Sequence, residues 1–371
     1  MVDKAEMEHE EYQIDYKKVV EAIERQNKRK NNLEELVKKY VLPFLPAKSL
    51  ARFKAVSKEW NQWISNPFLP HMQSNFFRQI SGLFCQNEQG TISFISLDSN
   101  TYDIPQHSLN FMPVFVNLVS TCNGLLFCQD RFGGTYYVCS PVYREWKELP
   151  EPSYYHGEKP AAVLAFDPYL LNFEAHFDLI CAFPLIDIPV ICFEIYSSKT
   201  NSWRVSSVEC LSEEGLDLTF AGFYMKGYAY WMTKSGNILV CDVKNEVFDV
   251  LPLSADSKKG GTLTEMYGEL CYVCSSDMFE HECEIEIYGG LDMTLKLKIH
   301  LRLPDSINLV GECQMLPCIN GETLILLVEG TIICYHVRDG RIQVLSRTGN
   351  SPESRYLPYV NSLVSLSCQL E

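Results

Sequence analysis

A repeated hairpin pattern constrains this 371-residue chain more than any other feature of its sequence. Each copy has an apolar, strand-like run, a polar turn, and a second apolar or aromatic run that often ends in Leu-Pro. The copies recur about every 50 residues: Ile92–Pro105, Tyr137–Pro150, Cys192–Val205, Ile238–Pro252, Ile285–Pro304 and Ile332–Leu345. One such sheet alone would expose an apolar face and an edge, whereas a radial arrangement of six buries both. The repeat therefore predicts an all-β propeller with six blades.

A ring of blades has to be closed by strands from the two ends of the repeat region. The β-prone run Tyr359–Leu366 has no later segment with which it could pair. We therefore predict that this run pairs in the blade that contains residues 83–105, so that a late strand completes the first sheet.

Residues 32–77 are the only strongly helical part of the sequence, because their apolar side chains recur at helical spacing. Pro43 should end the first helix at Leu42, and Ser57 stands where the cap of a third helix is expected. Three short helices in about 45 residues form only a marginal core. We therefore expect this segment to hide an apolar face against a partner. One more helix, over residues 68–77, should lead into the sheets.

These patterns predict an α+β multi-domain chain with three parts. Residues 1–31 are dense in both charge signs, which is typical of a disordered or helical tail. Residues 32–77 form the short three-helix module, and residues 78–371 form the propeller.

Charge and hydropathy exclude two classes of partner. The net charge of −15 argues against a nucleic-acid surface, since phosphate contacts need clustered Lys and Arg. No apolar run approaches the roughly 20 residues of a membrane span, and the first ten residues are too charged for a signal peptide. We therefore expect no nucleic-acid or membrane partner and a location in the cytoplasm or nucleus, where the 15 cysteines stay reduced.

The sequence carries no recognisable catalytic motif. It has no GxSxG, no HExxH, no phosphate loop and no dinucleotide fingerprint. Cys271 and Cys274 have the CxxC spacing of metal and redox sites, but residues three apart on a strand point to opposite faces. His281 and Cys283 are near enough to keep a metal site open as an alternative. We expect no catalytic residue, no metal and no cofactor.

The helical segment resembles a known module in the order of its residues. The positions that carry the resemblance are Leu42, the run Leu45–Leu50, Arg52, Phe53, Val56, Lys58, Trp60 and the run Ile64–Pro67. In this order they resemble the F-box, the adaptor-binding module of SCF-type ubiquitin ligases.

The strand-rich region resembles the F-box-associated domain of plant F-box proteins, a relative of kelch-type propellers. The segments that carry this second resemblance are Cys122–Cys128, Cys139–Pro150, Ala165–Pro168, Glu194–Arg204 and Gly227–Trp231. No copy of the repeat has the double-glycine signature of true kelch repeats at the equivalent position. Together the two resemblances cover the chain from about residue 32 to residue 366.

The resemblance implies the substrate-recognition subunit of an SCF-type ubiquitin ligase, with no catalytic centre of its own. The helices would dock on a Skp-type adaptor and through it on a cullin, and the propeller would hold an unknown target protein for ubiquitination. The adaptor-binding residues that it implies are Leu36, Leu42, Leu45, Pro46, Leu50, Phe53, Val56 and Trp60. Phe53 and Trp60 have the size of interface anchors, and Trp60 could equally belong to the core of the module.

Loops on one propeller face are the expected target-binding sites. The candidates are Arg131, Phe132, Tyr154, Tyr155 and Phe183, which include the large aromatic side chains that would be informative if exposed. Two alternatives remain open. One is a scaffold that binds the adaptor without promoting ubiquitination, and the other is a propeller-based enzyme, in which carboxylates or metal ligands would converge at the central channel.

Overall fold

The computed structural model describes most of the chain. The described residues are 33–66, 68–76, 80–97, 108–132, 134–168, 172, 174–185, 190–208, 210–211, 218, 222–253, 260–304, 306–307, 309–319, 322–345 and 354–366, together with 25, 28 and 29. The predicted tail over residues 1–31 lies outside them apart from those last three positions. No helix in the described part of the chain is long and apolar enough to cross a membrane.

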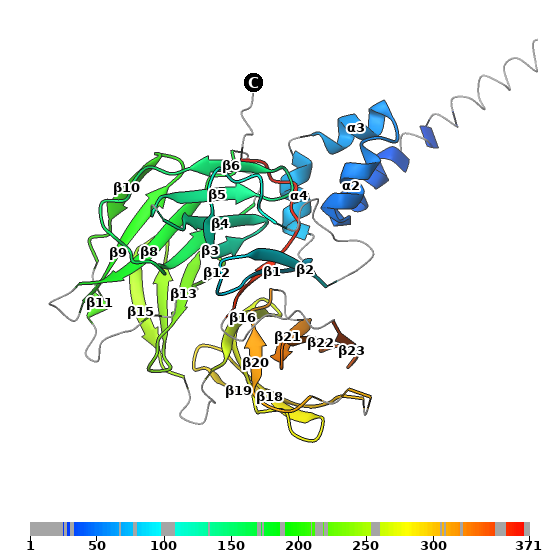
Figure 1. The fold of residues 1–371 in the computed structure, drawn as a ribbon. Coiled ribbons are helices and arrows are strands. Elements are labelled where there is room, and N and C mark those ends of the chain that lie inside the picture. Colours follow the sequence, from blue (N-terminus) through cyan, green and yellow to red (C-terminus); the bar gives the residue numbers. More distant parts are fainter. Residues whose placement is uncertain are drawn as a thin grey trace, which may run out of the picture.

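The helices lie at the beginning of the described chain (Figure 1). Residues 33–40 are helical. They are followed by the 3-10 helix η1 (Leu42–Phe44) and by the α-helices α2 (Ala47–Phe53), α3 (Lys58–Ile64) and α4 (Phe68–Phe76). We call residues 33–76 the helical module.

Two local predictions for this module can be compared with its helix ends. The Ser57 hydroxyl accepts a hydrogen bond from the Trp60 amide at 3.2 Å, so Ser57 does cap α3. The first helix ends at Tyr40, earlier than the predicted Leu42, because Pro43 has no N–H to donate to the preceding α-helical turn and the chain continues there as the 3-10 helix η1.

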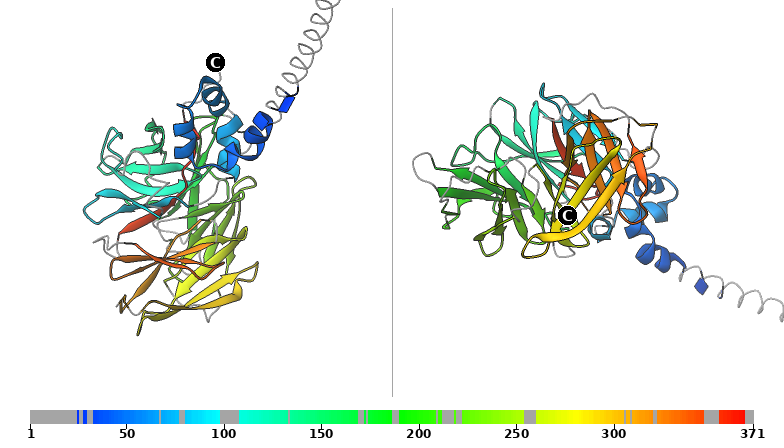
Figure 2. Two further views of the ribbon diagram at one scale, coloured as in Figure 1. Left: turned by 90° about the vertical axis from the view of Figure 1, so that its right-hand side faces the viewer. Right: turned by 90° about the horizontal axis from the view of Figure 1, so that it is seen from below.

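The remaining described residues form six antiparallel sheets arranged as blades (Figures 1 and 2). Blade 1 contains β24 (Arg355–Tyr359), β1 (Gly82–Gln86) and β2 (Ile92–Ser96). Blade 2 contains β3 (Val116–Cys122), β4 (Leu125–Asp130), β5 (Tyr136–Ser140) and β6 (Glu145–Glu148). Blade 3 contains β7 (Ala161–Ala165), β8 (Asp178–Pro184), β9 (Val190–Ser197) and β10 (Ser202–Val205), with β11 (Cys210–Leu211) also paired to β9.

The last three blades have four strands each. Blade 4 contains β12 (Phe223–Met225), β13 (Tyr228–Met232), β14 (Ile238–Asp242) and β15 (Val247–Leu251). Blade 5 contains β16 (Thr262–Met266), β17 (Glu269–Ser275), β18 (Glu282–Gly289) and β19 (Thr294–Arg302). Blade 6 contains β20 (Cys313–Leu316), β21 (Thr323–Val328), β22 (Thr331–His336) and β23 (Ile342–Val344). The predicted six-bladed propeller is confirmed.

Five of the six predicted hairpins are the outer strand pairs of blades 2 to 6. They are β5–β6, β9–β10, β14–β15, β18–β19 and β22–β23. The sixth, Ile92–Pro105, begins with β2, and its second half at 98–105 lies outside the described residues.

Six hydrophobic clusters lie between adjacent blades and hold the ring together. The clusters pair blades 1 and 2, 2 and 3, 3 and 4, 4 and 5, 5 and 6, and 6 and 1 in turn. Because the pairs form a complete cycle, each sheet buries both faces and none is left with an open side.

The ring closes in the blade that the sequence predicts, but with a different strand. β24 spans Arg355–Tyr359 and pairs antiparallel with β1, whereas residues 360–366 leave the sheet. The predicted run Tyr359–Leu366 was therefore wrong in its bounds. Pro358 lies within β24, where it is tolerated because β24 is the innermost strand and pairs on one side only.

The apolar side chains after β24 pack against other partners. Leu363 joins the core of the helical module, and Val364 joins the cluster between blades 2 and 3. Ser362 and Ser74 of α4 are hydrogen-bonded through their hydroxyls. The C-terminal segment, red in Figure 1, thus runs between blade 2 and α4 and fixes the helical module to the propeller.

The connections of blade 2 define the two faces of the propeller. Successive turns in an antiparallel sheet alternate between its two ends. The turns at 123–124 and 141–144 therefore lie on one face, with the C-terminal segment and the helical module, since Tyr143 packs against the module. The connections at 131–135 and 149–160 lie on the opposite face. We call these the helix-side face and the open face.

Candidate functional site

The helical module has a small core of its own. Its buried side chains are Leu42, Ala47, Leu50, Ile64, Leu69 and Leu363. The Gln73 side chain donates to the Leu45 carbonyl at 3.3 Å, which ties α4 to the segment after η1. Short helices of this kind are held in place by packing more than by their own propensity.

The outer surface of the module is unusually apolar. Among the described residues, eight of 25 exposed large hydrophobic side chains lie within it, although the module is a small part of the chain. These eight are Leu33, Leu36, Tyr40, Val41, Phe44, Val56, Phe68 and Phe76. We call them the apolar helix surface. Exposed apolar side chains gathered on one small element indicate a protein contact.

The predicted adaptor-binding residues divide into three groups by burial. Leu36 and Val56 are exposed and belong to the apolar helix surface. The partly buried residues are Leu45, Pro46, Phe53 and Trp60. Leu42 and Leu50 are buried in the module core, so in this conformation they can support a docking surface but cannot touch a partner.

Trp60 packs against the core of the module and is only partly buried. Its ring packs edge-on against Phe53 at 5.3 Å between centroids and lies 5.6 Å from the ring of Trp63. Sequence reasoning missed Phe44 and Phe76, whose rings are in contact at 4.9 Å, because neither lies on an obvious helical stripe.

The open face carries an aromatic group near blade 2. Phe132, Tyr154 and Tyr155 are exposed there, as is Phe115, which the sequence did not indicate. Arg131 donates its amide to the Phe115 carbonyl at 2.9 Å, and its guanidinium lies 5.9 Å from the Phe132 ring centroid. The structure thus brings together four of the five predicted target-binding residues around one part of the open face.

Phe183, the fifth predicted target-binding residue, is buried. Its ring stacks on that of Tyr154 at 5.2 Å and lies 5.4 Å from the ring of His156. Phe183 therefore supports the exposed aromatic side chains from below and does not present itself to a partner in this conformation. The Ile186–Pro189 part of the same predicted loop lies outside the described residues.

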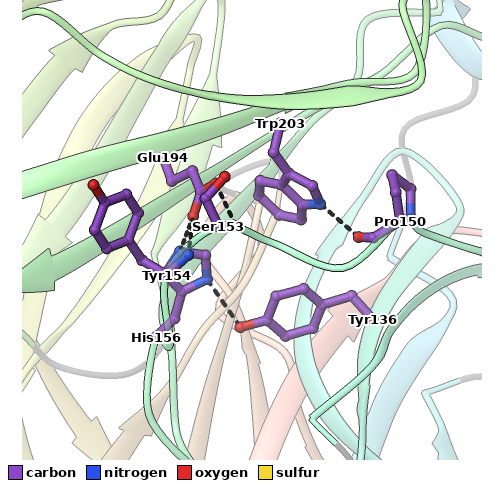
Figure 3. A network of polar contacts seen from close by, with 7 residues as sticks. All are labelled: Tyr136, Pro150, Ser153, Tyr154, His156, Glu194 and Trp203. Carbon is purple, nitrogen blue, oxygen red and sulfur yellow. Dashed lines mark hydrogen bonds and ion pairs between the residues drawn. The ribbon is translucent and has the colours of Figure 1, made fainter.

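A buried polar network positions the segment that carries Tyr154 and Tyr155 (Figure 3). The carboxylate of Glu194, on β9, accepts hydrogen bonds from the Ser153 amide at 2.8 Å and the Tyr154 amide at 3.2 Å. It also contacts Nε2 of His156 at 3.0 Å, and neither side chain of this pair is exposed. One carboxylate thus fixes three groups of a connecting segment, which explains why a loop here keeps a defined shape.

The same network extends to blade 2. Nδ1 of His156 lies 3.1 Å from the hydroxyl of Tyr136, so a neutral imidazole can donate to Glu194 and accept from Tyr136. Burial lowers the pKa of His156, against the opposing effect of Glu194. The Trp203 indole donates to the Pro150 carbonyl at 2.7 Å and fixes the beginning of the segment.

The propeller encloses a central channel of about 1640 Å³. Its walls come from β24, β3, β12, β16 and β20, and its open-face mouth is formed by the connections after β1, β4 and β6. Cys271 and Cys274 face the clusters on opposite sides of β17, as their spacing predicts. Within the described residues, no group of three or more His, Cys, Asp or Glu side chains is arranged to hold a metal ion.

Comparison with known proteins agrees with both parts of this architecture. Residues 68–289, more than half of the chain, match the family model of the F-box associated beta propeller domain. Three Arabidopsis thaliana proteins are similar to the chain. F-box protein At5g07610 is 27% identical over 57% of this chain and 54% of the relative. F-box protein At5g03970 is 23% identical over 83% of this chain and 82% of the relative. F-box protein At5g49610 is 29% identical over 64% of this chain and 68% of the relative. The matched region spans only about half the length of the first of these relatives.

Proposed function

This chain belongs to the plant F-box proteins that carry an F-box-associated β-propeller, and we propose that it is the substrate-recognition subunit of an SCF-type ubiquitin ligase. In this proposal the helical module docks on a Skp-type adaptor and through it on a cullin. The propeller holds a target protein on its open face. The chain acts in the cytoplasm or nucleus.

The mechanism that we propose is proximity. A target held on the open face is present at a high effective concentration beside the ubiquitin-charged enzyme, and a favourable encounter then occurs far more often than between free molecules. The residues of this chain bind and orient, and no chemical step is assigned to them.

One observation carries the proposal: the apolar helix surface lies on the opposite side of the propeller from the exposed aromatic side chains of the open face. A partner on the helices and a target on the open face could therefore bind at the same time. The adaptor would cover apolar side chains that otherwise remain in contact with water, at a gain of about 25 cal/mol for each Å².

The test is a binding measurement between the purified chain and a Skp-type adaptor. We expect the Leu36→Asp/Val56→Asp double variant to bind at least about tenfold more weakly, since each change places a charge in an apolar contact. Both positions are exposed, so the fold should persist. A variant of Leu50, which is fully buried, would confuse lost docking with lost folding.

Val247→Asp is the matched control. Val247 lies on β15 and is 60% exposed, close to the 64% of Val56, but it is far from the helical module in the chain and belongs to blade 4. This variant should bind the adaptor like the unchanged chain. Adaptor binding without any ubiquitin transfer to captured proteins would favour the scaffold alternative, and a folded chain that binds no adaptor would contradict the proposal.

A further inference from the structure

The open-face end of the central channel contains a partly buried cation. Arg355 begins β24, lines the channel, and pairs across the sheet with Gln86 of β1. Burial lowers the pKa of Arg355 to about 10. Among the described residues no carboxylate lies within ion-pair distance of its guanidinium. Even a partly buried charge with no counter-charge among the described residues is costly, so its retention needs a reason.

Part of that reason is the unpaired edge of β3. The register of β3 with β4 shifts between Leu118 and Ser120, so that Val119 is unaligned while Leu118 stays opposite Cys128. Because β3 pairs only with β4, its other edge can bond to blade 1, and it does so through Leu118. Its amide donates to the Gln86 side chain at 2.8 Å, and its carbonyl accepts from Nη1 of Arg355. Gln86 also donates to the Val116 carbonyl at 2.9 Å. These bonds hold Arg355 in place but use one of its five N–H donors.

Further polar atoms at the same end of the channel are buried and lack a hydrogen-bond partner. They are Oε1 of Gln129, Oε1 of Gln314 and Oγ of Ser354. Gln129 is only 4% exposed and Ser354 only 6%. Gln129 is fixed by its amide, which donates to the Gly157 carbonyl at 3.2 Å, so its oxygen remains available. A ligand with N–H or O–H donors could pair with these atoms, each of which costs about 1–3 kcal/mol when it is left unpaired.

The mouth above these groups is acidic. Carboxylates from the connections of blades 1 to 3 surround it: Glu88, Asp130, Glu148, Glu151 and Glu158. Arg131 and Lys159 are the cations among the described residues at this mouth. A ligand that fits both parts would carry a carboxylate at its inner end and positive charge farther out.

We propose that the channel binds the C-terminal end of the target protein. The free α-carboxylate pairs with the remaining donors of Arg355, a backbone N–H donates to Gln129, and Lys or Arg side chains a few residues earlier meet the acidic mouth. A chain end can enter a channel directly, whereas an internal segment has to double back to enter it. The cavity also exceeds the roughly 300–1,000 Å³ of small-molecule pockets. This inference rests on the proposed function, because it names the part of the target that the open face recognises.

The test is fluorescence polarisation with the full chain and three labelled peptide mixtures. The first is X-X-Lys-Lys-X-X with a free C-terminal carboxylate, where X is a mixture of uncharged residues. The second is the same mixture with a C-terminal amide. The third is amidated and carries Glu at one inner position, so that it offers a side-chain carboxylate. We expect the first mixture to bind at least about tenfold more tightly than the other two.

Arg355→Gln should remove that preference, so that the free-carboxylate and amidated mixtures bind alike. The matched control is Arg302→Gln on the outer strand β19, where the arginine is exposed, and it should leave the preference intact. If Arg355→Gln does not fold, the carboxylate preference of the unchanged chain remains decisive. Equal binding of free and amidated peptides, or no binding of any mixture, would overturn the inference. Preference for the third mixture would reject the α-carboxylate in favour of a side chain.

Adaptor binding separates this inference from the proposed function. A chain that binds the adaptor but shows no carboxylate preference contradicts only the channel site. A chain that shows the preference yet binds no adaptor contradicts only the ligase role.

Discussion

Glu194 offers the sharpest test of how the open face is held in shape. It is fully buried and accepts three hydrogen bonds from the segment that presents Tyr154 and Tyr155. Glu194→Ala would leave two backbone amides and the His156 imidazole without an acceptor. A buried donor left without an acceptor costs about 1–3 kcal/mol, so with three such donors we expect a loss of at least about 3 kcal/mol in the free energy of unfolding.

Glu194→Gln should cost less, and the geometry shows why. Oε2 receives the Tyr154 amide and the His156 ring, whereas Oε1 receives the Ser153 amide alone. A glutamine that keeps its carbonyl oxygen at the Oε2 position loses only the Ser153 bond and places two donors face to face. The expected loss is about 1–3 kcal/mol.

Urea unfolding, followed by tryptophan fluorescence, measures both losses. The matched control is Glu174→Ala, because Glu174 also contacts a histidine, His176, at 2.9 Å, but both side chains are exposed to solvent. That change should alter stability by less than about 1 kcal/mol. If Glu194→Ala costs no more than Glu174→Ala, the network does not position the segment and the reasoning is refuted.

Three further predictions concern other parts of the molecule. Burial lowers the pKa of His156 in the folded chain, so the imidazole binds a proton more readily in the unfolded chain, where it titrates near pH 6.5. The contribution of His156 to stability should therefore be complete above about pH 6.5 and should fall as the pH drops below it. His156→Gln should flatten that part of a profile of melting temperature against pH. Gly124→Ala should lower the melting temperature, since Gly124 has φ +89° and an added Cβ would collide with the Cβ of Ser362 in the segment that fixes the helices. Leu50→Ala should cost about 2–5 kcal/mol in urea unfolding because Leu50 is fully buried, whereas Val56→Ala should cost less than about 1 kcal/mol, and equal losses would contradict the division between module core and docking surface.

The repeated hairpins could be predicted from the sequence, whereas the contacts between distant segments could not. Hairpins such as β14–β15 are local, so alternation and turn residues predict them directly. The closing strand was predicted in the correct blade, but its predicted bounds were shifted toward the C-terminus. Proline is unfavourable within a strand that pairs on both sides, and only the structure shows that β24, which contains Pro358, pairs on one side.

The open face shows the same limit. Aromatic residues in loops could be identified, but their burial depends on the neighbouring blade, and Phe183 proved to lie beneath Tyr154. The pairing of His156 with Glu194 joins residues 38 positions apart and has no local pattern. One signal was present: a glutamate within the apolar run Cys192–Tyr196 is unusual, and a buried carboxylate needs partners.

Hydrogen–deuterium exchange of the full chain, with and without a Skp-type adaptor, tests the central claim most directly. The account predicts slower exchange of backbone amides within residues 33–64 when the adaptor is bound, because the apolar helix surface becomes covered. Exchange at residues 131–132 and 153–156 should not change, because the open face stays available for a target. Protection of those open-face residues by the adaptor, with no change in the helices, would contradict the account.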